Sequence, residues 1–134
     1  MSDVLHKFCR EYMRVQPTVP IRFSQLSVLN ILCLTPGPHT PMMLAKVLGV
    51  SRPMIASHLS ALQVAGLVVR MTSPDDGRSM YILPTKKGKA LFEKTNRDLE
   101  KINSNLAKKM GQKNFQTLLK LVSQASDALS DTQA

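Results

Sequence analysis

The sequence predicts a mainly α-helical fold with one small β-hairpin, and two observations predict it. Apolar residues recur at helical spacing over most of the chain. Segment 67–84 breaks this period, because the β-branched, apolar run LVVRMT is followed by the turn sequence SPDDG and by RSMYILP, which is typical of a returning strand. With 134 residues, 43% of them hydrophobic and 20% charged, the chain has the size and composition of a single soluble globular domain.

The first two helices are expected before residue 35. Residues 3–15 form an amphipathic helix whose apolar stripe holds Val4, Leu5, Phe8, Cys9 and Tyr12, and which Pro17 and Pro20 end. Ser24 is expected to cap a second helix that extends to about Leu34, with Phe23 and Val28 forming a hydrophobic staple.

Capping residues mark the remaining helices. Thr40 followed by Pro41 opens a third helix that stops at Gly49, and Ser51 caps a fourth helix over about 52–65. Thr85 caps a long fifth helix that extends to Gly111. A sixth helix is indicated by Phe115, Leu118, Leu119, Val122 and Leu129.

Residues 40–65 have the spacing of a helix-turn-helix. Ala45 is small where a second helix crosses, Gly49 suits a positive φ in the turn, and Ile55 points back into the core. The alternative is an ordinary antiparallel helix pair. The hairpin that follows favours a winged helix-turn-helix, in which one helix enters the major groove and the wing follows the backbone or minor groove.

Net charge points to a polyanionic partner. The chain carries +9, and residues 86–110 alone contribute +5. Aromatic content of 4% without Trp argues against a single-strand binder. We find no glycine-rich phosphate loop, metal-ligand spacing or nucleophile–base set, so no enzyme activity, cofactor or metal is expected. No apolar run has the length of a membrane span and no signal-peptide core is seen, so the cytoplasm is the expected compartment.

Residues 47–88, VLGVSRPMIASHLSALQVAGLVVRMTSPDDGRSMYILPTKKG, resemble the DNA-binding region of the MarR family of bacterial regulators. The most specific part is the wing, where Asp76-x-Arg78 follows Ser73-Pro74 and precedes Leu83-Pro84-Thr85 and Gly88. The resemblance implies one MarR-like domain, with a winged lobe at about 24–88 and dimerisation helices at about 1–20 and 89–134. It also implies a homodimer on a pseudo-palindromic duplex operator, acting as a repressor that a small ligand or oxidation releases.

The fourth helix and the wing supply the candidate DNA contacts. Arg52, Pro53, Met54 and Ser57 lie opposite the stripe predicted to be buried, where Arg52 can contact guanine or phosphate and Met54 a thymine methyl. The family often has Arg where Ser57 and Ala61 stand, so base readout is expected to be weak.

By resemblance, Arg78 reaches into or beside the minor groove and Asp76 orients it; the alternative for both is a solvated turn. His58 lies at the edge of the buried stripe, where packing competes with a base contact. Lys86 begins a basic first turn of the fifth helix, which suits nearby phosphates or plain solvent exposure.

Effector contacts follow from the resemblance alone. Family relatives bind ligands between the dimer helices and the winged lobe, which suggests a pocket, with ordinary core packing as the alternative. Its candidate residues are Tyr12, Met13, Phe23, Cys33 and Met43. Cys9 is a candidate redox sensor near His6 and Arg10, although an inert buried thiol fits the same stripe. An alternative function is a winged-helix protein-interaction or scaffold module without specific DNA readout.

Overall fold

The computed structural model describes residues 2–74 and 77–132, which form six helices and one two-stranded antiparallel sheet. It divides into a winged unit, Thr18–Asn96, and a terminal unit, Met1–Pro17 with Arg97–Ala134. The bounds of the elements are α1 Ser2–Arg14, α2 Phe23–Leu34, α3 Pro41–Leu48, α4 Arg52–Val64, β1 Val68–Thr72, β2 Met80–Pro84, α5 Lys86–Met110 and α6 Gln112–Thr132. The predicted fold class is confirmed.

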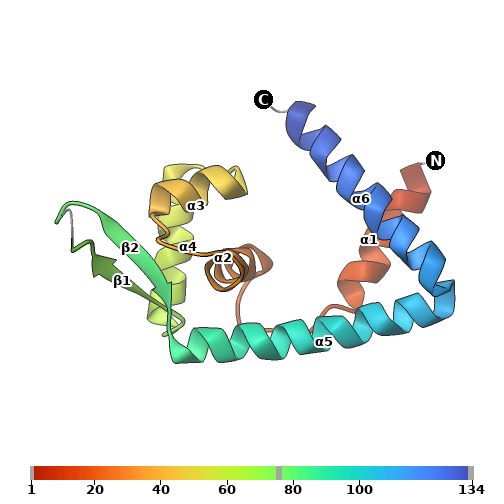
Figure 1. Cartoon of the computed structure of the whole chain (residues 1–134), viewed down its shortest axis with the longest axis horizontal. Helices are drawn as coiled ribbons and strands as arrows, with labels where there is room; N and C mark the ends of the chain where they lie inside the picture. Colours follow the sequence, from red (N-terminus) through yellow and green to blue (C-terminus); the bar gives the residue numbers. More distant parts are fainter. Residues whose placement is uncertain (1, 75–76, 133–134) are drawn as a thin grey trace. The chain divides into compact units, whose positions relative to one another are not determined.

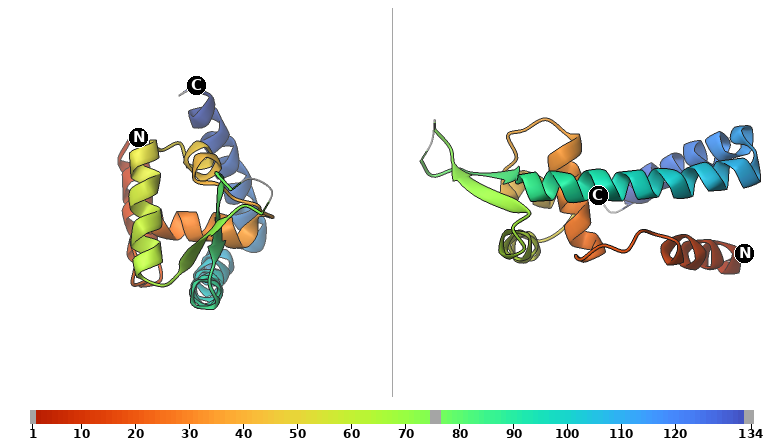
Figure 2. Two further views of the ribbon diagram at one scale, coloured as in Figure 1. Left: turned by 90° about the vertical axis from the view of Figure 1, so that its left-hand side faces the viewer. Right: turned by 90° about the horizontal axis from the view of Figure 1, so that it is seen from below.

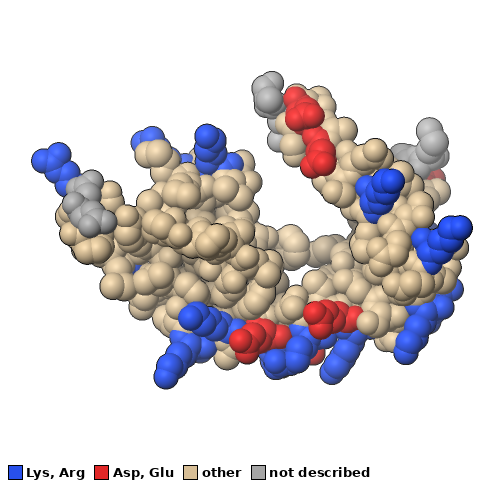
Figure 3. All heavy atoms as spheres, in the orientation of Figure 1, with Lys and Arg blue, Asp and Glu red and all other residues tan. Residues whose placement is uncertain are grey.

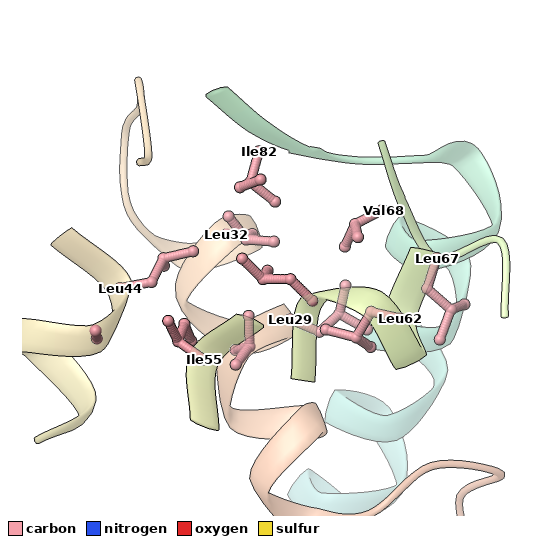
Figure 4. Packing of buried hydrophobic residues seen from close by; sticks show 11 residues of the cluster. Leu29, Leu32, Leu44, Ile55, Leu62, Leu67, Val68 and Ile82 are labelled. Atoms are coloured by element: carbon pink, nitrogen blue, oxygen red, sulfur yellow. The ribbon is translucent and has the colours of Figure 1, made fainter. Parts of the chain in front are cut away.

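The winged unit is a cluster of three helices, α2 to α4, beside which the β1–β2 hairpin extends (Figures 1 and 2). Its core joins α2, α4 and the hairpin, with Leu29, Leu62 and Ile82 each fully buried (Figure 4). In the hairpin, Val68 pairs with Pro84 and Arg70 with Ile82, so these four residues share one face of the sheet. Val68 and Ile82 therefore anchor the wing by burying apolar surface against the helices.

The predicted caps are present at both helices of the helix-turn-helix, α3 and α4. The Thr40 hydroxyl accepts from Met43 N, and the Ser51 hydroxyl accepts from Met54 N, at 3.2 Å in each case. Gly49 ends α3 with φ 65°, a conformation that costs glycine little. The expected start of α2 was wrong by two residues, because Arg22 and not Ser24 is its N-cap.

The side chain of Gln25 accounts for the earlier start of α2. Gln25 accepts a hydrogen bond from Arg22 N through its side-chain oxygen at 3.2 Å, which satisfies the backbone at the helix start. Ile21 precedes the cap and packs against the core, and Leu26 is buried at the fourth helical position. Phe23 instead lies in the first turn with 62% of its surface exposed, so it does not form the predicted staple with Val28.

Three hydrogen bonds hold the hairpin and the start of α5 in place within the winged unit. Ile82 N donates to His39 O at 2.9 Å, and the Thr85 hydroxyl donates to Gly66 O at 2.6 Å. Gly88 N in turn donates to the Thr85 hydroxyl, which makes Thr85 the predicted cap of α5. Gly88 is buried so tightly that a Cβ there would lie 2.1 Å from Leu67 O. The hairpin and the start of α5 are thus held against the same backbone turn.

The terminal unit leaves much of its apolar surface uncovered. Phe115 and Ala107 are buried within it, at the start of α6 and near the end of α5. The apolar stripe of α1 is exposed, with Val4 and Leu5 retaining 70% and 67% of their surface. Leu119, Leu121, Val122 and Leu129 of α6 are exposed as well. So much exposed apolar surface is unusual for a protein that works as a monomer.

Candidate nucleic-acid interface

Burial fixes which face of α4 is available to a ligand. Ile55, Leu59 and Leu62 are buried in the core, as the sequence predicted. Because a helix turns 100° per residue, Pro53 and Ser57 lie on the opposite side, whereas Met54 and Arg52 lie on its two flanks, Arg52 next to the buried stripe. All four are exposed. His58 is half-buried at the edge between the two faces.

Arg52 and Arg78, from different elements, line one open groove of about 560 Å³ in the winged unit. Its other walls come from the start of α3, from α4 and from the wing. They are Thr40, Pro41, Met42, Ile55, Ala56, Ser79 and Met80. Both arginines are exposed, so two guanidinium groups border an otherwise largely apolar groove. Asp76, the expected partner of Arg78, lies outside the described residues.

The lysines that begin α5 differ in their surroundings. Lys86 is exposed, whereas the Lys87 ammonium donates to Ala65 O at 2.9 Å. Ala65 is the C-cap of α4, where carbonyl groups lack helical partners and the helix dipole favours a cation. The contact with the end of α4 therefore accounts for Lys87. Lys86 has no such contact described and stays the candidate for binding a phosphate.

Carboxylates are scarce in the sequence of the winged unit. From residue 12 to residue 92 the only carboxylates of the sequence are Asp75 and Asp76. Lys and Arg side chains are visible over the wing, α3 and α4 in Figure 3. Lys46 and Arg70 are both exposed here and were not among the sequence candidates. The absence of carboxylates around them was the signal that could have found them.

The candidate effector residues fall in both units. Tyr12 lines a cleft of about 360 Å³ between α1 and α5, with apolar walls from Phe8, Val15, Ile102 and Leu106. Met13, Phe23 and Met43 each retain at least half of their surface. Cys33 packs against the edge of the core of the winged unit.

The two thiols have opposite environments. Cys9 is exposed on α1, although the sequence pattern also allowed a buried position. Burial raises the pKa of the Cys33 thiol, with Glu93 acting in the same direction and Lys89 against it. A raised pKa lowers the thiolate fraction, so Cys33 is the less reactive of the two. Among residues 2–74 and 77–132, no group of three His, Cys, Asp or Glu side chains could hold a metal ion.

A helix-turn-helix followed by a hairpin that seats an arginine beside the second helix defines the class of winged-helix DNA-binding proteins. None of the helices in the described part of the chain is long and apolar enough to cross a membrane. Residues 19–79 match the sequence model of the MarR family. The winged unit thus resembles the MarR family of transcriptional regulators in sequence, and solved structures of such regulators share the fold of the chain.

Solved structures of regulators share this fold over nearly the whole chain. The transcriptional repressor CouR, bound to a 23-mer DNA duplex, is 28% identical, with a TM-score of 0.72 over 90% of this chain and 89% of CouR. FabT of Streptococcus pneumoniae, in complex with DNA, is 18% identical, with a TM-score of 0.78 over 97% and 92%. PcaV of Streptomyces coelicolor, in complex with its natural ligand, is 20% identical, with a TM-score of 0.73 over 96% and 90%.

Proposed function

We propose that this chain is a homodimeric, sequence-specific DNA-binding repressor, and not an enzyme, whose winged lobe at about 24–88 binds one half of a pseudo-palindromic operator. The observation that carries the proposal is the groove shared by Arg52 of α4 and Arg78 of the wing. A helix in the major groove and a cation beside the minor groove are needed together to bind a duplex in this manner. CouR, a repressor with 28% identity, is bound to a duplex.

The roles of the candidate residues follow from their positions. Arg52 contacts a guanine or a phosphate, while Pro53, Met54 and Ser57 face the bases of the major groove. Arg78, oriented by Asp76, approaches the minor groove, and Lys86 binds a phosphate. His58 supports the edge of α4. The lack of carboxylates from residue 12 to 92, apart from Asp75 and Asp76, removes most of the charge that would repel a duplex.

Dimerisation is assigned to helices at about 1–20 and 89–134. The support is the uncovered apolar surface of α1 and α6, where Val4, Leu5 and Leu129 are each more than two-thirds exposed. A second copy of the chain would bury this surface and space two winged lobes for a symmetric operator. Removal of residues 111–134 is expected to yield monomers or aggregates in light scattering, and a stable monodisperse monomer would contradict this assignment.

Release from DNA is assigned to a small ligand or to oxidation of Cys9. The ligand proposal draws on PcaV, whose structure contains its natural ligand, and on the candidates Tyr12, Met13, Phe23, Cys33 and Met43. The oxidation proposal draws on Cys9, which is exposed on α1 within one chain and must stay accessible beside the dimer contact to act as a sensing thiol. A Cys9→Ser variant that still leaves the operator on peroxide treatment would exclude this thiol as the sensor.

Selection of bound sites from random duplex DNA tests the DNA-binding proposal directly. We expect enrichment of a pseudo-palindrome whose half-sites lie about one helical turn apart. Arg78→Ala should then weaken operator binding by about 1–3 kcal/mol and leave the dimer intact. Failure to enrich any sequence, with binding no stronger than to random duplex, would instead favour a protein-interaction module.

A further inference from the structure

The outward face of α4 is made of short side chains. Pro53, Ala56, Ser57 and Ser60 are exposed, and Ala61 is half-buried beside them. Met54 borders this face with about half of its surface free, at 48%. We call these six residues the flat face. Since none but Met54 reaches far from the helix axis, the backbone of α4 can approach the floor of a groove closely.

The flat face has few groups for reading base edges by hydrogen bonding. Arg and Lys suit guanine, Asn and Gln suit adenine, and Asp and Glu suit cytosine, whereas a hydroxyl such as that of Ser57 or Ser60 pairs with either kind of group and so discriminates little. Of these residue types α4 contains only Arg52, in its first turn, and Gln63, in its last turn. The first residues of a recognition helix make most base contacts, so Arg52 is the one well-placed bidentate reader.

What the flat face offers instead is apolar surface. The Pro53 ring, the Met54 side chain and the Ala56 methyl group are exposed in the first five positions of α4. Met42 and Met80 extend the apolar surface, because they line the groove that also contains Arg52 and Ala56. In the major groove, the one apolar group that distinguishes a base pair is the 5-methyl group of thymine.

We propose that α4 recognises its operator mainly through thymine 5-methyl groups, which pack against Pro53, Met54 and Ala56 next to one guanine bound by Arg52. This inference rests on the proposed function and specifies the sequence class of its operator. Each half-site is then a thymine-rich step beside a single G·C pair. Burial of a methyl group stabilises the complex by the hydrophobic effect, which corresponds to about a fourfold gain in affinity for each contacted thymine.

Uracil in place of thymine tests the proposal, since it removes only the methyl group and keeps every hydrogen-bonding atom. The operator obtained by selection is synthesised with deoxyuridine at single thymine positions of each half-site. The ratio of Kd values for the uracil and thymine duplexes is measured by fluorescence anisotropy at fixed salt. Equal numbers of replacements in the flanking sequence serve as the DNA control.

Variants assign the methyl contact to the protein. In Met54→Ala the uracil-to-thymine ratio should fall toward one at one position of each half-site, whereas the other positions keep their ratio. Leu34→Ala also shortens an exposed apolar side chain, at the end of α2, and should leave every ratio unchanged. Because each ratio is taken within one variant, a general loss of affinity does not affect the result.

The outcomes separate this inference from the proposed function. A loss of about fourfold per replaced thymine, reduced at one position by Met54→Ala, supports methyl readout. An enriched operator that tolerates uracil at every position overturns methyl readout and leaves the proposed DNA-binding function standing. The same holds if Met54→Ala keeps all ratios. Failure to enrich any sequence removes both.

Discussion

Replacement of Gly88 by alanine should destabilise the protein because the start of α5 has no room for a side chain. The added Cβ would lie 2.1 Å from Leu67 O, 3.1 Å from Leu67 C and 3.3 Å from a methyl carbon of Leu29. The closest atom belongs to the backbone and cannot rotate away. Relief of the overlap requires α5 and the turn before β1 to separate by about 1 Å, given ordinary carbon–oxygen contact distances.

That separation has a calculable cost. Leu67 O also accepts from Thr85 N at 3.0 Å, so the same movement strains this hydrogen bond. Overpacking costs about 1–3 kcal/mol and a lost hydrogen bond about 1 kcal/mol. Alanine returns about 1 kcal/mol through its better helix propensity. The net loss is about 1–3 kcal/mol, which lowers the Tm of a chain of this length by roughly 4–12 °C.

Thermal unfolding followed by circular dichroism measures the effect. Wild type and variants are compared at one protein concentration, because the Tm of an oligomer depends on it. Gly77→Ala is the matched control, since no atom of the described residues, its chain neighbours aside, lies within 4 Å of its added Cβ. Its stability should change by less than about 0.5 kcal/mol. A Gly88→Ala variant that melts within about 2 °C of wild type would refute the close approach of α5 to Leu67.

Two further substitutions and one chemical modification test individual contacts of the winged unit. Lys87→Ala removes the hydrogen bond to Ala65 O and should lower the free energy of unfolding, measured in urea, by about 0.5–1 kcal/mol. An unchanged urea midpoint would mean that this contact contributes nothing to stability. Gly49→Ala should cost about 1 kcal/mol although its Cβ meets open space, because φ is 65°, and a neutral result would contradict the left-handed turn. Cys9 should react with iodoacetamide about tenfold faster than Cys33 at neutral pH, because burial raises the pKa of Cys33 and its thiolate forms only at higher pH. Equal rates by mass spectrometry would contradict the burial of Cys33.

The sequence was sufficient where a residue acts on its own neighbourhood. Thr40 and Ser51 cap helices within three residues, and Gly49 turns the chain by its own φ, so these features of the helix-turn-helix were predicted and found. The buried stripe of α4 follows from helical spacing in the same way. Local signals failed at Ser24, because Arg22 with Gln25 offers a competing cap. The packing of Ile21 against the core accompanies the earlier start of α2.

The sequence by itself determined the helices and strands of this protein and the residues exposed on α4, since both depend on periodicity and capping over a few residues. Only the tertiary structure decided which side chains from distant segments meet. It brings Arg52 and Arg78 to one groove, Lys87 to the end of α4, and Gly88 against Leu67, across separations of about twenty residues or more. These contacts depend on how the hairpin packs on the helices, which no short stretch of sequence encodes.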